Sequence, residues 1–174
     1  LGLNSCSVPA ADGWIFEMCL NHVKPKNILE TGFYRGGSAF IMMSLDEDVK
    51  LTSVDPVESF EQVVRARRTD FSEEERAIKV VSENFEDRFT FIRKKSQDIR
   101  EDLKDEEFDF IFIDGDHWED GIRNDFQLML DLNIKYGLVD DWVQPHNAPK
   151  SVLTVYQEEF KDKLKVKAVF FRVG

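Results

Sequence analysis

Apolar runs of strand length alternate with stretches of helical periodicity along the 174 residues, and this alternation constrains the fold more than any other feature. The strand-like runs lie at residues 27–30, 51–54, 89–92, 108–113 and 136–139. Strands that alternate with helices are typical of a parallel sheet with crossover connections. We therefore expect one α/β domain over residues 1–174, with helices on both faces of a mostly parallel central sheet.

The run at residues 108–113 is the strongest strand prediction, because it is apolar enough to be buried on both faces inside a sheet. Residues 122–130 carry apolar side chains at helical spacing and predict an amphipathic helix. A charged region at residues 59–88 is also predicted to be helical. Only one strand, at residues 165–173, is predicted after the last helix. We therefore expect a sheet abbreviated at its C-terminal end, or a chain that is a fragment of a longer one.

Composition and charge exclude several classes of function. A formal net charge of -11 argues against a nucleic-acid footprint, which needs clustered Lys and Arg. A basic cluster at Arg65, Arg67 and Arg68 is interpreted as a solvated helix face. Two cysteines make no disulfide framework, and no apolar run approaches the ~20 residues of a membrane span. We expect a cytoplasmic protein that acts on a small molecule, with neither nucleic acid nor membrane as partner, and we leave a homo-oligomer open.

A glycine-bearing turn follows the first predicted strand. It reads Glu30-Thr31-Gly32-Phe33-Tyr34-Arg35-Gly36-Gly37-Ser38. The glycines let the backbone turn tightly and approach a ligand, and Ser38 at the next helix start offers a hydroxyl and backbone N–H groups to a carboxylate. The spacing is neither G-x-G-x-x-G nor a P-loop, which argues against an ordinary dinucleotide or phosphate site. A purely structural turn is the alternative.

Polar residues also follow the next two strands. Asp55 ends the second strand about 20 residues after the turn, where a carboxylate can accept both hydroxyls of a ribose. Ser96 and Gln97 follow the strand at residues 89–92. Ligands of open α/β sheets lie beyond the carboxyl ends of the strands, so these residues are candidates for a cofactor site. A turn cap at Asp55 and a helix cap at Ser96 are the alternatives.

Aspartates gather after the last two of these strands. Asp114 and Asp116 follow the run at residues 108–113, and Asp140 and Asp141 follow the run at 136–139. If the two strands are neighbours, the carboxylates repel one another unless a cation or protons compensate. Oxygen ligands suit Mg²⁺ or Ca²⁺. The sequence therefore predicts a divalent-cation site, with helix capping by these aspartates as the alternative.

Taken together, these motifs resemble the class I, metal-dependent O-methyltransferases, both the bacterial sugar and macrolide group and the catechol group. The turn and the next residue follow the family pattern E-x-G-x-Y-x-G-x-S-A. Residues 96–99 resemble the adenine-side segment of the family, residues 114–117 its acidic loop, and Asp140-Asp141 its second metal pair. The resemblance runs from about residue 28 to 142 and implies a three-layer Rossmann-like fold.

The resemblance also implies the ligands and the residues that hold them. The cofactor would be S-adenosylmethionine, and the metal would be Mg²⁺. The residues around the cofactor would be Glu30, Gly32, Tyr34, Gly36 and Ser38 at the methionine part, Asp55 at the ribose, and Ser96, Gln97 and His117 at the adenine. The metal ligands would be Asp114, Asp140 and Asp141. Asp116 is the candidate base with His117 second, and Trp118 would wall the site.

The function implied is methylation of a hydroxyl group on a sugar, polyketide or catechol-like acceptor. The metal would lower the pKa of that hydroxyl and aim its oxygen at the methyl group. Two other functions stay open. One is a metal-dependent glycosyltransferase that uses Asp114-Gly115-Asp116 as a D-x-D motif. The other is a non-catalytic protein that keeps the cofactor pocket, which the short C-terminal end would favour.

Overall fold

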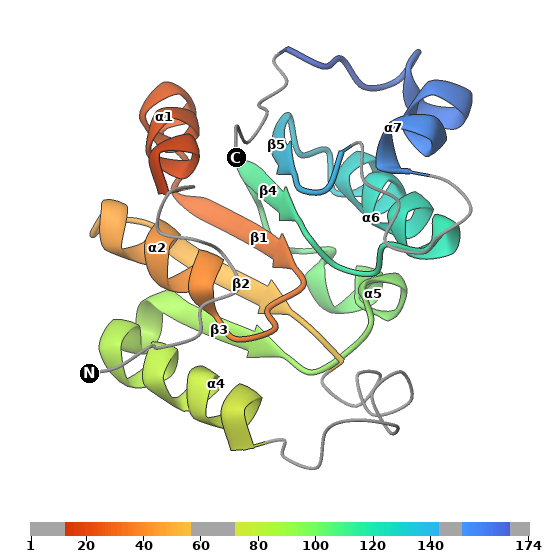
Figure 1. Cartoon of the computed structure of the whole chain (residues 1–174). Coiled ribbons are helices and arrows are strands. Elements are labelled where there is room, and N and C mark those ends of the chain that lie inside the picture. The colour runs from red at the N-terminus through yellow and green to blue at the C-terminus, as the bar shows by residue number, and fades with distance from the viewer. Residues whose placement is uncertain (1–12, 57–71, 143–150, 168–174) are drawn as a thin grey trace, which may run out of the picture.

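The structure is a computed structural model that describes residues 13–56, 72–142 and 151–167 (Figure 1). Five strands form one sheet in the order β3-β2-β1-β4-β5, and every neighbouring pair is parallel. The strands are β1 (Asn27–Thr31), β2 (Lys50–Val54), β3 (Phe89–Ile92), β4 (Phe110–Ile113) and β5 (Tyr136–Val139). The predicted parallel sheet is confirmed.

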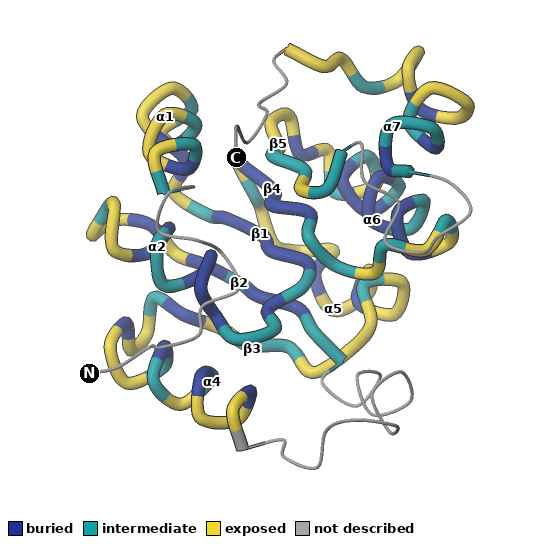
Figure 2. The backbone as a smooth tube through the Cα atoms, in the orientation of Figure 1, coloured by how far each residue is buried: buried dark blue, intermediate teal, exposed yellow. Residues whose placement is uncertain are grey.

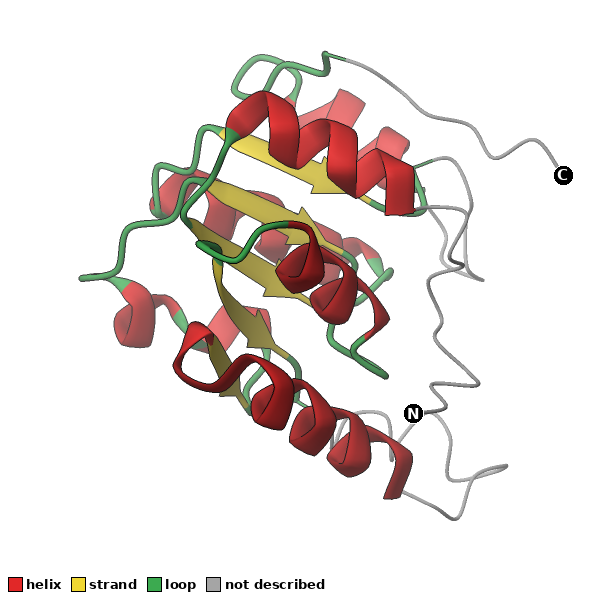
Figure 3. Cartoon of the chain, turned by 90° about the vertical axis from the view of Figure 1, so that its left-hand side faces the viewer, coloured by secondary structure: helices red, strands yellow, loops and turns green. Residues whose placement is uncertain are grey.

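Helices cover both faces of the sheet and make three layers (Figure 3). On one face lie α1 (Gly13–Val23), α2 (Gly37–Leu45) and α4 (Ser72–Phe85). On the other lie α5 (Arg100–Leu103), α6 (Glu119–Asp131) and α7 (Val152–Val155), with η4 (Tyr156–Phe160) after it. Two short 3₁₀ turns, η2 (Glu86–Arg88) and η3 (Ser96–Asp98), flank β3.

Side chains alternate along the strands and so divide the interior into two cores. In β4, Phe110 and Phe112 join the core under α1, α2 and α4, whereas Ile111 and Ile113 join the core under α5, α6 and α7. All four residues are buried, and Figure 2 shows the inner strands as buried segments between the helices. Burial on both faces explains why this strand is a nearly continuous apolar run.

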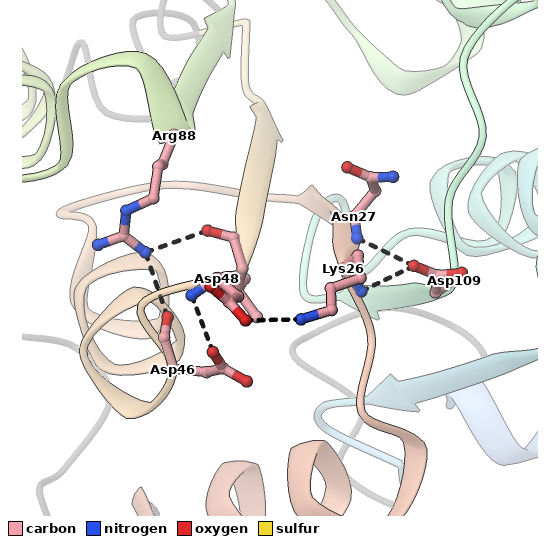
Figure 4. A network of polar contacts seen from close by, with 7 residues as sticks. Lys26, Asn27, Asp46, Asp48, Arg88 and Asp109 are labelled. Atoms are coloured by element: carbon pink, nitrogen blue, oxygen red, sulfur yellow. Dashed lines mark hydrogen bonds and ion pairs between the residues drawn. The ribbon is translucent and has the colours of Figure 1, made fainter.

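A polar network fixes the amino ends of the inner strands, at the edge of the sheet opposite the predicted site (Figure 4). The carboxylate of Asp109 accepts the backbone N–H groups of Lys26 and Asn27 at 2.7 and 3.0 Å. The ammonium of Lys26 pairs with Asp48 at 2.9 Å. β4 begins at Phe110, two residues later than predicted.

Two predicted elements extend beyond the described residues. The helical region at residues 59–88 is present as α4 and η2 from residue 72 onward, while Arg65, Arg67 and Arg68 lie outside the described part. Of the predicted last strand, residues 165–167 are described and are not in a strand. No helix in the described ranges is long and apolar enough to cross a membrane. A single domain over residues 1–174 stays a prediction.

Candidate functional site

The predicted site residues follow the carboxyl ends of the strands, which meet at one edge of the sheet (Figure 1). Backbone hydrogen bonds continue past the strands there, because the first residue after one strand donates its N–H to the last residue of the neighbouring strand. The donors in order across the sheet are Asp55, Gly32, Asp114 and Asp140, at 3.2, 2.9, 2.9 and 2.9 Å. Strand order reverses between β1 and β4, the switch point where open α/β sheets bind ligands.

Gly32 brings the turn after β1 against the loop after β4. Its φ is 90°, and a Cβ added there would lie 2.0 Å from the carbonyl oxygen of Asp114. Gly36 has a φ of 69°, and a Cβ there would lie 2.6 Å from the ring of Phe33. Both positions need glycine, because other residues would meet backbone or a buried ring in a left-handed conformation. The close approach of two backbones explains the glycine at position 32, and the packing of the Phe33 ring explains the glycine at position 36.

Asp55 holds the turn from the neighbouring strand. Its Oδ2 accepts the backbone N–H groups of Phe33 and Tyr34 at 2.9 and 3.0 Å. Tyr34 has a φ of 45°, an uncommon conformation for a residue with a side chain. Asp55 therefore caps the turn, as the structural alternative expected. A contact between Asp55 and the ribose remains a prediction.

Glu30 lies beneath the turn and is fully buried. The hydroxyl of Ser38 donates to one of its carboxylate oxygens, and the hydroxyl of Ser53 donates to the other. Burial raises the pKa of Glu30 to about 7; the two hydroxyl bonds oppose this, and the charge of Asp55 adds to it. Glu30 and Ser38 thus support the turn from inside the protein. Whether either also contacts the cofactor remains a prediction.

The buried Glu30 is expected to make stability depend on pH. Its pKa rises from 4.5 to about 7 on folding, so the folded chain binds the extra proton between these values and loses stability as the pH rises through them. The free energy of unfolding of the wild type, minus that of Glu30→Gln, should fall by about 3 kcal/mol from pH 4.5 to pH 8. Urea unfolding of both proteins across this pH range measures the difference. A difference in unfolding free energy that stays constant with pH would contradict the expectation. Glu47→Gln, at an exposed position, is the control.

A cluster of three side chains faces the switch point from the loops after β4 and β5. Asp114, His117 and Asp141 each offer one ligand atom, and these atoms all lie within 4.8 Å of one another. The His117 ring lies between the two carboxylates, with Nε2 3.7 Å from Asp114 and Nδ1 3.5 Å from Asp141. Burial raises the pKa of Asp114 well above its usual range, and the charges of Asp140, Asp141 and Glu30 add to this. The site therefore gathers negative charge.

The other two aspartates of these loops lie apart from that cluster. Asp140 is exposed, and its Oδ1 accepts the N–H of Asp141 at 2.9 Å, so it acts on Asp114 through its charge. Asp116 is also exposed, and its Oδ1 accepts the N–H of Trp118 at 3.1 Å in the turn before α6. The geometry brings His117, rather than Asp140, together with Asp114 and Asp141.

The adenine-side candidates lie at the start of η3, beside α6. Gln97 is exposed, and its side-chain oxygen accepts from Asn124 at 3.4 Å. Ser96 hydrogen bonds to the buried carboxylate of Asp125. Trp118, at the N-terminal end of α6, is 53% exposed and available as a wall of the site.

Two residues that shape this edge were missed by the sequence reasoning. Phe33 packs against Phe91 at a centroid distance of 5.1 Å and anchors the glycine turn in the core. Asp125 is 1% exposed. A signal for Asp125 was present, since it falls between Ile122 and Phe126 on the apolar face of an amphipathic helix.

The geometry agrees with comparisons to known proteins. A family model described as a methyltransferase domain matches residues 29–140. No curated protein matches this chain. Solved structures also match, and their low sequence identities to this chain establish a shared fold.

Three of these solved structures illustrate the similarity. A protein from Staphylococcus aureus assigned as a caffeoyl-CoA O-methyltransferase has a TM-score of 0.65 at 18% identity, covering 92% of this chain and 77% of its own. TomG, an O-methyltransferase of tomaymycin synthesis from Streptomyces achromogenes in complex with SAM, has a TM-score of 0.62 at 18% identity, covering 87% and 67%. An O-methyltransferase from Bacillus cereus in complex with SAH has a TM-score of 0.60 at 22% identity, covering 89% and 69%. The predicted Rossmann-like class is confirmed.

Proposed function

The chain belongs to the methyltransferase-domain family, and on that premise we propose that it transfers a methyl group from S-adenosylmethionine to a hydroxyl oxygen of a small molecule. The proposal depends on the residues that directly follow the strands and donate backbone hydrogen bonds to the neighbouring strand, because they lie within the matched region and at the edge where open α/β sheets bind ligands. These residues are Gly32, Asp55, Asp114 and Asp140. The similar O-methyltransferases, two of them in complex with SAM or SAH, support the cofactor and the oxygen acceptor.

The glycine turn is proposed to bind the methionine part of the cofactor and Asp55 its ribose. The turn leads into the start of α2, where backbone N–H groups suit a carboxylate. Tyr34 and Gly36 lie in the same turn. Ser96, Gln97 and His117 are proposed to lie by the adenine. Glu30 and Ser38 contribute by supporting the turn.

A divalent cation fits the acidic cluster. Asp114, His117 and Asp141 offer two carboxylates and an imidazole close together, and a cation would offset the burial and the neighbouring negative charges that raise the pKa of Asp114. Carboxylate oxygens suit Mg²⁺, while the imidazole would also accept Mn²⁺. Asp140, the remaining predicted metal ligand, would act on the cation through its charge. When bound, the cation would lower the pKa of the acceptor hydroxyl and orient its oxygen.

The reaction needs a base as well as a methyl donor. A bond forms between the acceptor oxygen and the methyl carbon as the carbon–sulfur bond breaks, so the sulfonium becomes a thioether and the hydroxyl proton must leave. Asp116 is the proposed base, because its carboxylate is exposed in the loop after β4 and lies outside the group that would bind the cation. His117 is second, since both nitrogens of its ring lie against Asp114 and Asp141 in that group.

Asp55→Ala is expected to weaken S-adenosylhomocysteine binding by about tenfold or more. The change removes the proposed ribose acceptor, and it also removes the acceptor that holds Phe33 and Tyr34. Isothermal titration calorimetry measures the affinity. Asp105→Ala, at an exposed position between α5 and β4, is the control. If the affinity of Asp55→Ala equals that of the wild type, the ribose assignment is wrong.

The proposal is tested by assaying S-adenosylhomocysteine release with S-adenosylmethionine and a panel of sugars, polyketides and catechols, with Mg²⁺ and then with EDTA. Turnover that EDTA suppresses is the expected result. No turnover with any hydroxyl acceptor would contradict it and would favour the non-catalytic alternative. The family match decides against the glycosyltransferase alternative. The cytoplasmic location and a homo-oligomer remain predictions.

A further inference from the structure

We propose that Asp125 is a positioning residue for the cofactor, because its buried carboxylate ties together the turn after β1, the loop after β4 and the segment at residues 96–98. This inference rests on the proposed function, since it concerns affinity for S-adenosylmethionine. Asp125 belongs to α6 and would not itself touch the reacting atoms.

The tie to β1 is a buried side-chain hydrogen bond. The hydroxyl of Thr31 donates to Oδ2 of Asp125 at 2.9 Å, across 94 positions in the sequence. Thr31 is 1% exposed, and it directly precedes Gly32, which approaches Asp114 closely at the switch point. A bond at Thr31 therefore restrains the start of the glycine turn.

The same carboxylate lies against the acidic loop and the adenine-side segment. A Cβ added at Gly115 would lie 2.9 Å from Oδ2 of Asp125 and 3.6 Å from Cβ of Thr31, so carboxylate, turn and loop pack without a gap. The side chain of Ser96 also hydrogen bonds to the carboxylate, and α6 packs against η3. Three segments proposed to surround the cofactor thus meet at one side chain.

Packing alone does not explain a carboxylate at this position. Burial raises the pKa of Asp125 to about 6, and the hydrogen bonds from Ser96 and Thr31 only partly oppose this. Its other oxygen, Oδ1, is buried and has no hydrogen-bond partner within the described ranges. An apolar residue would serve the apolar face of α6 without the cost of burying an acceptor. The carboxylate is therefore explained by the loops it holds.

The test compares S-adenosylhomocysteine affinity by calorimetry in the wild type, Asp125→Ala, Asp125→Asn and Thr31→Val. Alanine at 125 and valine at 31 should each weaken binding about tenfold, whereas asparagine, which can still bond both hydroxyls, should stay within about threefold of the wild type. The double variant Thr31→Val/Asp125→Ala should bind no more weakly than Asp125→Ala alone, because both changes remove the same bond.

Two variants on the same helix separate positioning from stability. Met129→Ala leaves a cavity in the core under α6 and should lower the free energy of unfolding without changing the affinity of the folded chain. Asp131→Ala removes an ion pair with Arg100 at the C-terminal end of α6 and should change neither. Wild-type affinity in a folded Asp125→Ala chain, or equal weakening in Met129→Ala, would overturn the inference.

Hydrogen exchange gives a readout that needs no cofactor. In Asp125→Ala, the backbone N–H groups of Gly32 and Asp114 should exchange faster, while those in the middle of β2 keep wild-type protection. Unchanged exchange at both residues would also overturn the inference. If the wild type fails to bind S-adenosylhomocysteine, the proposed function fails, and the exchange result still decides whether Asp125 ties the loops.

Discussion

Gly32→Ala is expected to abolish S-adenosylhomocysteine binding and to lower the free energy of unfolding by about 3 kcal/mol or more. The new Cβ would lie 2.0 Å from the Asp114 carbonyl oxygen, and the φ of 90° is strained for any residue with a side chain. The turn after β1 and the loop after β4 would have to separate. Urea unfolding gives the stability, and calorimetric titration gives the affinity.

Gly13→Ala is the matched control for this change. Gly13 begins α1, and the nearest heavy atom to an added Cβ is 3.9 Å away. This variant should bind the cofactor product like the wild type and be at least as stable. Wild-type stability and binding in Gly32→Ala would show that the two loops do not approach as closely as described.

Asp141→Ala is expected to lower kcat/KM for metal-dependent methyl transfer by about 100-fold or more, with the affinity for S-adenosylhomocysteine nearly unchanged. Asp141 follows β5, and its carboxylate faces Asp114 and His117 in the proposed cation cluster. Its φ of 51° is a conformation that aspartate tolerates better than most residues. Initial rates against Mg²⁺ concentration measure the effect.

Variants of two further aspartates serve as comparisons for the loss of kcat/KM. Asp140→Ala should reduce the rate less, by about tenfold, because this exposed residue acts through its charge. Asp120→Ala, on the surface of α6, should leave the rate unchanged. If Asp141→Ala keeps its metal dependence, the cation does not bind at this cluster. If it loses cofactor binding as well, the change has disturbed the whole edge of the sheet.

The fold could be predicted largely from the sequence, because strands buried on both faces are nearly continuous apolar runs. Phe110–Ile113 has such a run, and the helix after it has clear helical spacing. Where the strand begins could not be predicted. Asp109 reads as part of the run, but its carboxylate binds backbone groups of Lys26 and Asn27, more than 80 positions away in the sequence.

The candidate site could be predicted as a set of positions but not as a set of contacts. Parallel strands end at one edge, so residues that follow them must meet. Side-chain direction depends on the folded chain. Glu30 and Ser38 read as residues facing the cofactor, yet they bond to each other beneath the turn. Asp125 became a candidate only when its bond to Thr31 was known.

The most direct test of this account is a calorimetric titration of S-adenosylhomocysteine into the purified chain, first with Mg²⁺ and then with EDTA. The account predicts saturable binding of micromolar order under both conditions, because the proposed cofactor residues in the turn after β1, at Asp55 and at residues 96–97 are not ligands of the cation, and His117 alone belongs to both sets. No binding under either condition would contradict it, and the turn at residues 30–38 would then be purely structural.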